Sequence, residues 1–215
     1  DNERIAVFTD SYVSGVTYTT SSGLTGITGD AGVPGSFKYR PGDTVTFSVG
    51  DVTVGEFSAE VIQNNILFLQ DIAGVALSDV NNNYVENMAI FLQALDDDLV
   101  DNTPGDGTLQ TNDLANADSS FDNGINITQA VRDAFTGYID STTGGALNLA
   151  NAGKEMLSQA LAAVDIEFTR DSERHVSGQN VFETIAMQHV ADTIDDLAGA
   201  RGPVSYDART VDVLD

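Results

Sequence analysis

The sequence predicts an α+β protein, with an N-terminal antiparallel β-sandwich-like module and a helical segment packed on it. Residues 13–55 alternate apolar and polar side chains in short runs, with Gly, Pro or Asp at the breaks, as antiparallel strands do. After residue 58, apolar residues recur mainly at helical spacing. We therefore expect a β-module with an N-terminal arm at 1–57, a helical segment at 58–203 and a C-terminal strand-like arm at 204–215.

Six short stretches of the first part have strand character. They are residues 5–8, 16–20, 24–28, 36–39, 44–49 and 52–54. Gly50 and Asp51 separate the last two, which predicts a hairpin with a two-residue turn. Within 44–49, Val45, Phe47 and Val49 share one face, so that face should enter the core. Residues 5–8 are expected to form an edge strand or an arm.

The helical segment contains several capping signals. Residues 61–69 are predicted to form a helix or a mixed segment. Asn82 and Asn83 can cap one helix, and Thr128 can cap a second. Ser177 can cap a further helix, which ends at Gly202. Another helix is expected between the glycine pair 144–145 and about residue 164. Residues 96–123 form a long acidic loop, and the tail 204–215 alternates like a strand without a hairpin partner beside it.

The chain is strongly acidic. It has 33 Asp and Glu against 9 Lys and Arg, a formal net charge of −24. Such a charge repels phosphate backbones and anionic membranes, so we expect no nucleic-acid partner. Metal cations, basic surfaces and neutral sugars remain as partners. No apolar run approaches the roughly 20 residues of a membrane span, and the absence of cysteine excludes disulfides and zinc–thiolate sites.

The acidic loop is the best candidate for a binding site. Its carboxylates could supply the six to eight oxygens that calcium prefers. The first candidates for ligands are Asp96, Asp98 and Asp122, because they flank the loop at predicted helix ends. The loop lacks the register of an EF-hand, and the alternative is a solvated acidic loop that binds no ion.

No catalytic residues are predicted. Neither a G-x-S-x-G elbow nor an H-E-x-x-H motif occurs. His175 and His189 lie near and within the last predicted helix, where a structural histidine is the simpler interpretation. Paired carboxylates for a hydrolase are an open alternative, since 33 acidic residues always offer pairs.

The opening module contains a long and specific motif. The pattern is D-S-x-V-S-G-V-x-Y-T-T-S-S-G, then a turn, then F-x-Y-x-P-G-D-x-V-x-F-x-(I/V)-G-D-x-x-x-G. Its matching residues are Asp10, Ser11, Val13, Ser14, Gly15, Val16, Tyr18, Thr19, Thr20, Ser21, Ser22, Gly23, Phe37, Tyr39, Pro41, Gly42, Asp43, Val45, Phe47, Val49, Gly50, Asp51 and Gly55. On these residues the module resembles a segment of exported and surface proteins of marine gammaproteobacteria. It also looks like the transthyretin-type or carboxypeptidase-regulatory-type β-sandwich.

In similar proteins the module is followed by a helix ending F-L-Q-x-L-D and later by D-N-G-I-x-I. Here these motifs are Phe91, Leu92, Gln93, Leu95 and Asp96, then Asp122, Asn123, Gly124, Ile125 and Ile127. The resemblance spans residues 10 to about 135 and implies an extracellular or cell-surface location with a structural or adhesive role. Many such proteins have an anchoring N-terminal cysteine that this chain lacks, and its acidic loop is longer.

These observations predict a non-enzymatic extracellular structural protein. We expect it to self-assemble into a homo-oligomer or filament by exchange of its terminal arms, because exposed strand edges accept further strands. The alternative is a calcium-dependent adhesion or ligand-binding module with a surface or carbohydrate ligand. A hydrolase is a more distant third hypothesis.

Overall fold

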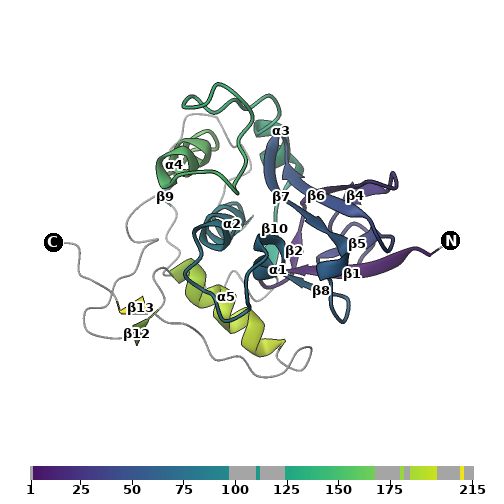
Figure 1. Cartoon of the computed structure of the whole chain (residues 1–215). Helices are drawn as coiled ribbons and strands as arrows, with labels where there is room; N and C mark the ends of the chain where they lie inside the picture. Colours follow the sequence, from purple (N-terminus) through teal and green to yellow (C-terminus); the bar gives the residue numbers. More distant parts are fainter. Residues whose placement is uncertain are drawn as a thin grey trace.

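The computed structural model describes residues 2–96, 110–111, 124–167, 180–181, 185–197 and 209–210. It confirms the α+β class, with two main sheets and five α-helices in the described chain. Figure 1 shows the sheets on one side of the molecule and α2, α4 and α5 on the other. Among the described helices, none has the length and apolar character that crossing a bilayer requires.

The larger sheet is antiparallel and has four strands. In spatial order these are β4 (Thr25–Ile27), β3 (Thr17–Thr20), β6 (Thr44–Val49) and β7 (Val52–Ser58). The predicted two-residue turn joins β6 to β7, with Val49 paired to Val52. Val45, Phe47 and Val49 are fully buried, as the alternation predicted.

A second sheet of three strands faces the first. It consists of β5 (Ser36–Tyr39), β1 (Arg4–Thr9) and β8 (Ile66–Phe68), in that spatial order. β1 pairs antiparallel with β5 and parallel with β8. The expectation of an N-terminal edge strand or arm was therefore wrong, because both edges of β1 are hydrogen-bonded within the chain. The segment 61–69, predicted to be a helix or a mixed segment, is mixed: it contains the end of a 3-10 turn, the strand β8 and the first residue of α1.

Aromatic rings fill the space between the two sheets. Phe8 of β1 stacks on Phe47 of β6 with centroids 4.6 Å apart. Phe37 of β5 and Phe57 of β7 meet the same ring edge-on, at 5.1 and 5.2 Å. Phe47 is therefore in contact with rings from both sheets. Such pairs contribute about 0.5–1.5 kcal/mol each beyond burial.

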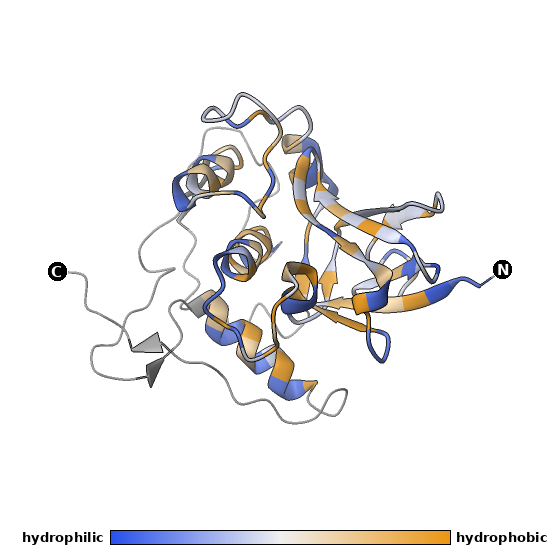
Figure 2. Ribbon diagram, viewed as in Figure 1, coloured by the Kyte–Doolittle hydropathy of each residue, from blue (hydrophilic) through white to orange (hydrophobic). Residues whose placement is uncertain are grey.

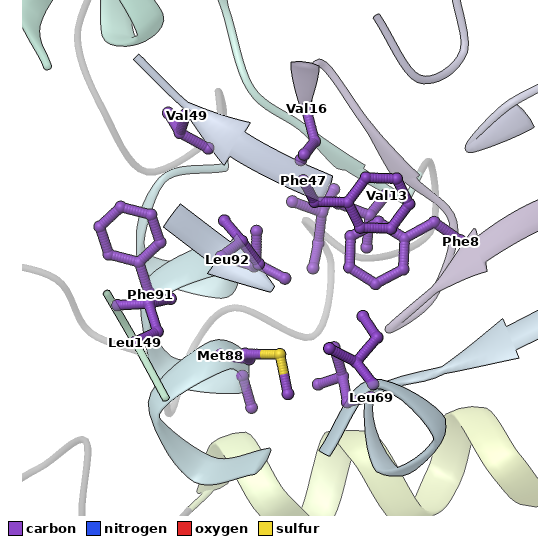
Figure 3. Close-up of a cluster of buried hydrophobic side chains, with 14 of the residues drawn as sticks. Phe8, Val13, Val16, Phe47, Val49, Leu69, Met88, Phe91, Leu92 and Leu149 are labelled. Atoms are coloured by element: carbon purple, nitrogen blue, oxygen red, sulfur yellow. The ribbon is translucent and has the colours of Figure 1, made fainter. Parts of the chain in front are cut away.

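The central helix is α2 (Asn83–Ala94), which begins at the predicted Asn82 cap. The Asn82 side chain accepts hydrogen bonds from the backbone N–H groups of Tyr84 and Val85. Every residue from Val85 to Leu95 is buried, so the helix is enclosed rather than half-exposed. Figure 3 shows Met88 and Leu92 of α2 beside the side chains that the sheets contribute to the core.

The described chain has four further α-helices. They are α1 (Leu69–Ala73), α3 (Gln129–Ala134), α4 (Lys154–Ala162) and α5 (Ile185–Asp196). A 3-10 turn covers Ala59–Val61. Thr128 caps α3 as predicted, by accepting from the N–H of Val131. Figure 2 shows that α5 has a hydrophobic and a hydrophilic face. The cap predicted at Ser177 lies outside the described residues.

Short backbone pairings join the helical part to the sheets. β10 (Ile125–Asn126) pairs parallel with β2 (Val13–Ser14). The backbone of Thr53 at the outer edge of β7 hydrogen-bonds to Leu147 and Leu149. The chain after residue 58 is therefore not helix and loop alone, because it supplies strands to both sides of the β-module.

Smaller pairings complete the described elements. β9 (Gln110–Thr111) pairs parallel with β11 (Ile166–Glu167), and β12 (Asn180–Val181) pairs antiparallel with β13 (Arg209–Thr210). β13 lies within the predicted C-terminal arm, and the rest of that arm lies outside the described residues.

Candidate functional site

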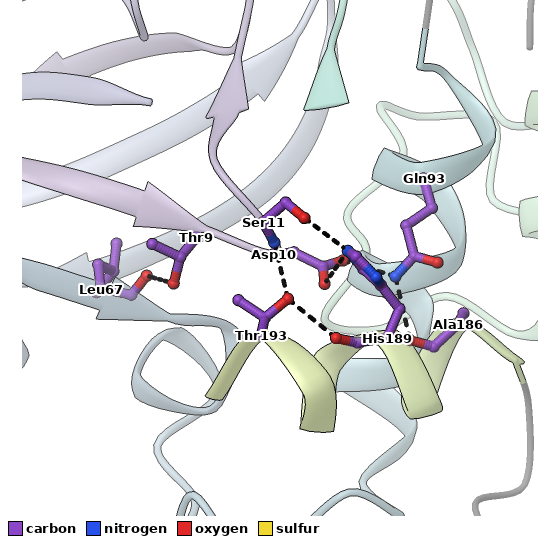
Figure 4. Close-up of polar contacts among 8 residues, drawn as sticks. All are labelled: Thr9, Asp10, Ser11, Leu67, Gln93, Ala186, His189 and Thr193. Atoms are coloured by element: carbon purple, nitrogen blue, oxygen red, sulfur yellow. Dashed lines mark hydrogen bonds and ion pairs between the residues drawn. The ribbon is translucent and has the colours of Figure 1, made fainter. Parts of the chain in front are cut away.

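A group of polar side chains lies where β1, α2 and α5 meet. We call it the Asp10 cluster, and it consists of Asp10, Ser11, Gln93, His189 and Thr193 (Figure 4). Ser11 and Thr193 are in direct contact although 182 positions separate them in the sequence. The cluster therefore forms only when the two ends of the described chain come together.

The backbone at Ser11 directs this residue toward α5. Ser11 follows β1 in a tight turn and has a φ of 55°, which is uncommon for a residue with a side chain. In this conformation its N–H donates to Thr193 Oγ1 at 2.9 Å, and its Oγ lies 3.0 Å from His189 Nε2. Thr193 Oγ1 in turn donates to the carbonyl of His189, one helical turn earlier.

Asp10 is the buried charge of the cluster. Its side chain has no exposed surface, and its Oδ2 accepts a 2.8 Å hydrogen bond from Gln93 Nε2. His189 Nε2 lies 3.7 Å from Oδ1. Burial raises the pKa of Asp10 above 3.8, and the charge of His189 and the bond from Gln93 offset only part of this effect.

Gln93 joins the two sides of the cluster. It is fully buried on α2, and its Nε2 donates both to Asp10 and to the carbonyl of Ala186 at 3.1 Å. One amide group therefore contacts the end of β1 and the start of α5. Loss of either acceptor would leave a buried donor with fewer bonds, which typically costs about 1–3 kcal/mol.

The residue types match a Ser-His-Asp triad, but the geometry does not. In a triad the acid holds one ring nitrogen while the other nitrogen accepts the serine proton. Here Ser11 Oγ and Asp10 Oδ1 both approach Nε2 of His189. The N–H of Ser11, which could stabilise an oxyanion, is bonded to Thr193. The described contacts of the cluster join α5 to the end of β1.

Asp96, the first predicted calcium ligand, lies just beyond α2. Its side chain is fully buried, and its Oδ1 accepts a 3.0 Å hydrogen bond from the N–H of Asn126. Asp98 and Asp122 lie outside the described residues. Among the described side chains, no three acidic or histidine groups converge as a metal site would require. The calcium site stays a prediction.

The sequence did not identify the Asp10 cluster as a site. His189 was predicted to be structural, and its contacts within the cluster agree with that role. His175 lies outside the described residues. Asp10, Ser11 and Gln93 all belong to the motifs that carry the resemblance, and this was the one signal that could have pointed to them.

The chain was compared with family models, curated proteins and solved structures, and none of them matches it.

Proposed function

We propose that this chain is a non-enzymatic extracellular structural protein with a β-sandwich-like module, and that its copies join by strand addition. The observation that carries the proposal is a pair of strand edges. Among the described strands, β4 pairs only with β3, and β5 pairs only with β1. A cavity of about 250 Å³ is lined by residues of both strands. Such edges are the usual acceptors of an added strand.

The cavity has features that suit an extended segment. The N–H of Gly29, just after β4, donates to the carbonyl of Ser36 at the start of β5. This hydrogen bond joins the two strands at one end of the cavity. Tyr18 and Phe37 line the cavity and are buried, whereas Ile5 is 54% exposed. A strand with alternating apolar side chains would cover Ile5 while its backbone bonds to the open edges.

The C-terminal arm is the donor in this proposal. Donation of residues 1–9 would remove the middle strand of the three-stranded sheet, since β1 is bonded on both sides. Residues 211–215 read VDVLD, with valines at alternate positions. They therefore have the period that a half-buried strand requires.

Assembly should be measured by negative-stain electron microscopy and light scattering of the full chain. We expect filaments or oligomers from the parent protein and monomers after deletion of residues 211–215. Ile5→Asp should also block assembly by placing a charge in the cavity. Val33→Asp is the matched control, because Val33 is 55% exposed and does not line this cavity. A monomeric parent protein, or assembly unaffected by both changes, would contradict the proposal.

The second candidate is a calcium-dependent adhesion or ligand-binding module. The bond between Asp96 and Asn126 favours it, because it holds the two ends of the acidic segment 97–123 at one place. Calorimetry should then detect calcium binding, and calcium should raise the melting temperature above that of an EDTA control. Replacing Asp98 and Asp122 together by Asn should remove the rise, whereas Asp133→Asn on α3 should not. An unchanged melting temperature in millimolar calcium would exclude this function.

A further inference from the structure

A second cavity, of about 360 Å³, lies where three chain segments meet. Ser14 of β2, the turn that contains Asp30, and the segment from Asn126 to Arg132 line it. Its volume falls in the range of roughly 300–1,000 Å³ that small-molecule sites occupy. We propose that this cavity binds a neutral saccharide. The inference does not depend on self-assembly.

Arg132 is held rigidly at this cavity. Its Nη1 donates to the carbonyls of Gly15 and Ile127, at 3.0 and 2.8 Å. Gly15 has a φ of 90°, and a Cβ there would collide with the carbonyl oxygen of Ile127. Glycine therefore allows β2 and β10 to approach closely enough for both carbonyls to bind one nitrogen.

The rest of the guanidinium is available for a ligand. Within the described chain, Nε and Nη2 of Arg132 donate no hydrogen bond, and Arg132 forms no salt bridge. These groups are donors only. An arginine fixed through one nitrogen keeps its other donors in a defined direction. Binding of a ligand would therefore cost little further side-chain entropy of Arg132.

The other polar groups complement Arg132. The carboxylate of Asp30 only accepts, the amides of Asn126 and Gln129 both donate and accept, and the Ser14 hydroxyl keeps its proton while accepting from the N–H of Gly35 at 2.9 Å. Each sugar hydroxyl donates one hydrogen bond and accepts others. A mixture of pure donors, pure acceptors and amides therefore matches a set of hydroxyls better than it matches a single anion.

Charge selects a neutral ligand over an acidic one. The chain carries a net charge of −24, and Asp30 stands at the exposed rim of the cavity. One arginine cannot offset this field, so acidic polysaccharides would be repelled at low salt. A neutral sugar experiences no such repulsion.

The test is a ligand screen by nuclear magnetic resonance on the full chain. Glucose, galactose, mannose, N-acetylglucosamine, maltose and cellobiose are the neutral probes, and galacturonate is the charged one. We expect at least one neutral sugar to shift the backbone amides of Gly15, Gly29 and Asn126. Tighter binding of galacturonate than of every neutral sugar would overturn the assignment, as would the absence of any shift in millimolar sugar.

Two exposed lining residues allow a test without loss of the fold. Asp30→Ala and Gln129→Ala remove side chains for which the described chain shows no hydrogen bond, and each should weaken sugar binding about tenfold. Gln63→Ala is the control, because Gln63 is exposed and lies outside the cavity lining. Equal affinity in all three variants would refute this location for the site.

Discussion

The buried carboxylate of Asp10 makes a sharp prediction about the pH dependence of stability. Asp10→Asn replaces it by an amide of the same shape. The amide oxygen can still accept the bond from Gln93 Nε2, and the amide nitrogen would face His189 Nε2. The substitution therefore removes the buried charge while it keeps the packing of β1, α2 and α5.

The direction in which stability changes with pH follows from the raised pKa of Asp10. The folded protein keeps the Asp10 proton in a pH range where the unfolded chain, with a value near 3.8, has already lost it. The free energy of unfolding of the parent protein therefore falls as the pH rises from this value through the folded pKa. One proton contributes a slope of at most about 1.4 kcal/mol per pH unit. The Asp10→Asn variant lacks this contribution.

The assay is urea denaturation of both proteins at a series of pH values from about 4 to 7. The free energy of unfolding of the parent minus that of Asp10→Asn should fall with rising pH. Asp133→Asn, which removes an exposed charge, shows whether loss of any one negative charge has the same effect. A difference that grows with pH would mean that ionised Asp10 stabilises the fold, and it would refute the reasoning.

Three further predictions test the packing. Phe47→Ala should lower the free energy of unfolding by about 3–5 kcal/mol in urea, because its buried ring meets rings from both sheets; a loss below about 1 kcal/mol would contradict that role. Gly15→Ala should lower the free energy of unfolding more than Gly32→Ala. Both glycines have a positive φ, but only Gly15 lies against the carbonyl of Ile127. Equal losses of stability in the two variants would show that this close approach is unimportant. Burial, with a smaller contribution from a nearby Glu, raises the pKa of Tyr84 to about 12, so stability should fall as pH rises from about 10 through that value. Tyr84→Phe should remove the last step of the ultraviolet tyrosine titration, and its persistence would assign that step to another tyrosine.

The sequence correctly predicted the elements that depend on residues close to one another in the chain. The hairpin of β6 and β7 could be placed because alternation and the turn residues Gly50 and Asp51 agree. The caps at Asn82 and Thr128 were also correct, since a side chain bonding two or three residues ahead is visible in the sequence. The α+β class follows from these elements together.

Pairings between distant segments could not be predicted in the same way. The apolar run at 66–68 is too short to distinguish a helix from a buried strand, and its parallel partner β1 lies far away in the sequence. The contact between Ser11 and His189 spans 178 positions. No spacing rule covers such a contact, so a single sequence with two histidines offered no reason to place His189 beside Asp10.

The Asp10 cluster contains residues from both sides of the acidic segment 97–123. Asp10, Ser11 and Gln93 precede this segment in the sequence, and His189 and Thr193 follow it. β1 and α2 precede residue 97, whereas β10 and α5 follow residue 123. A protease that cut between these positions would leave two fragments still joined by the pairing of β2 with β10 and by the contacts of Asp10 and Gln93 with α5. We expect the nicked protein to migrate as one particle until it is denatured. The protein could thus be reconstituted from two separately produced halves. Their affinity would measure the combined strength of the β2–β10 pairing, the polar cluster and the packing of α2 against α4 and α5.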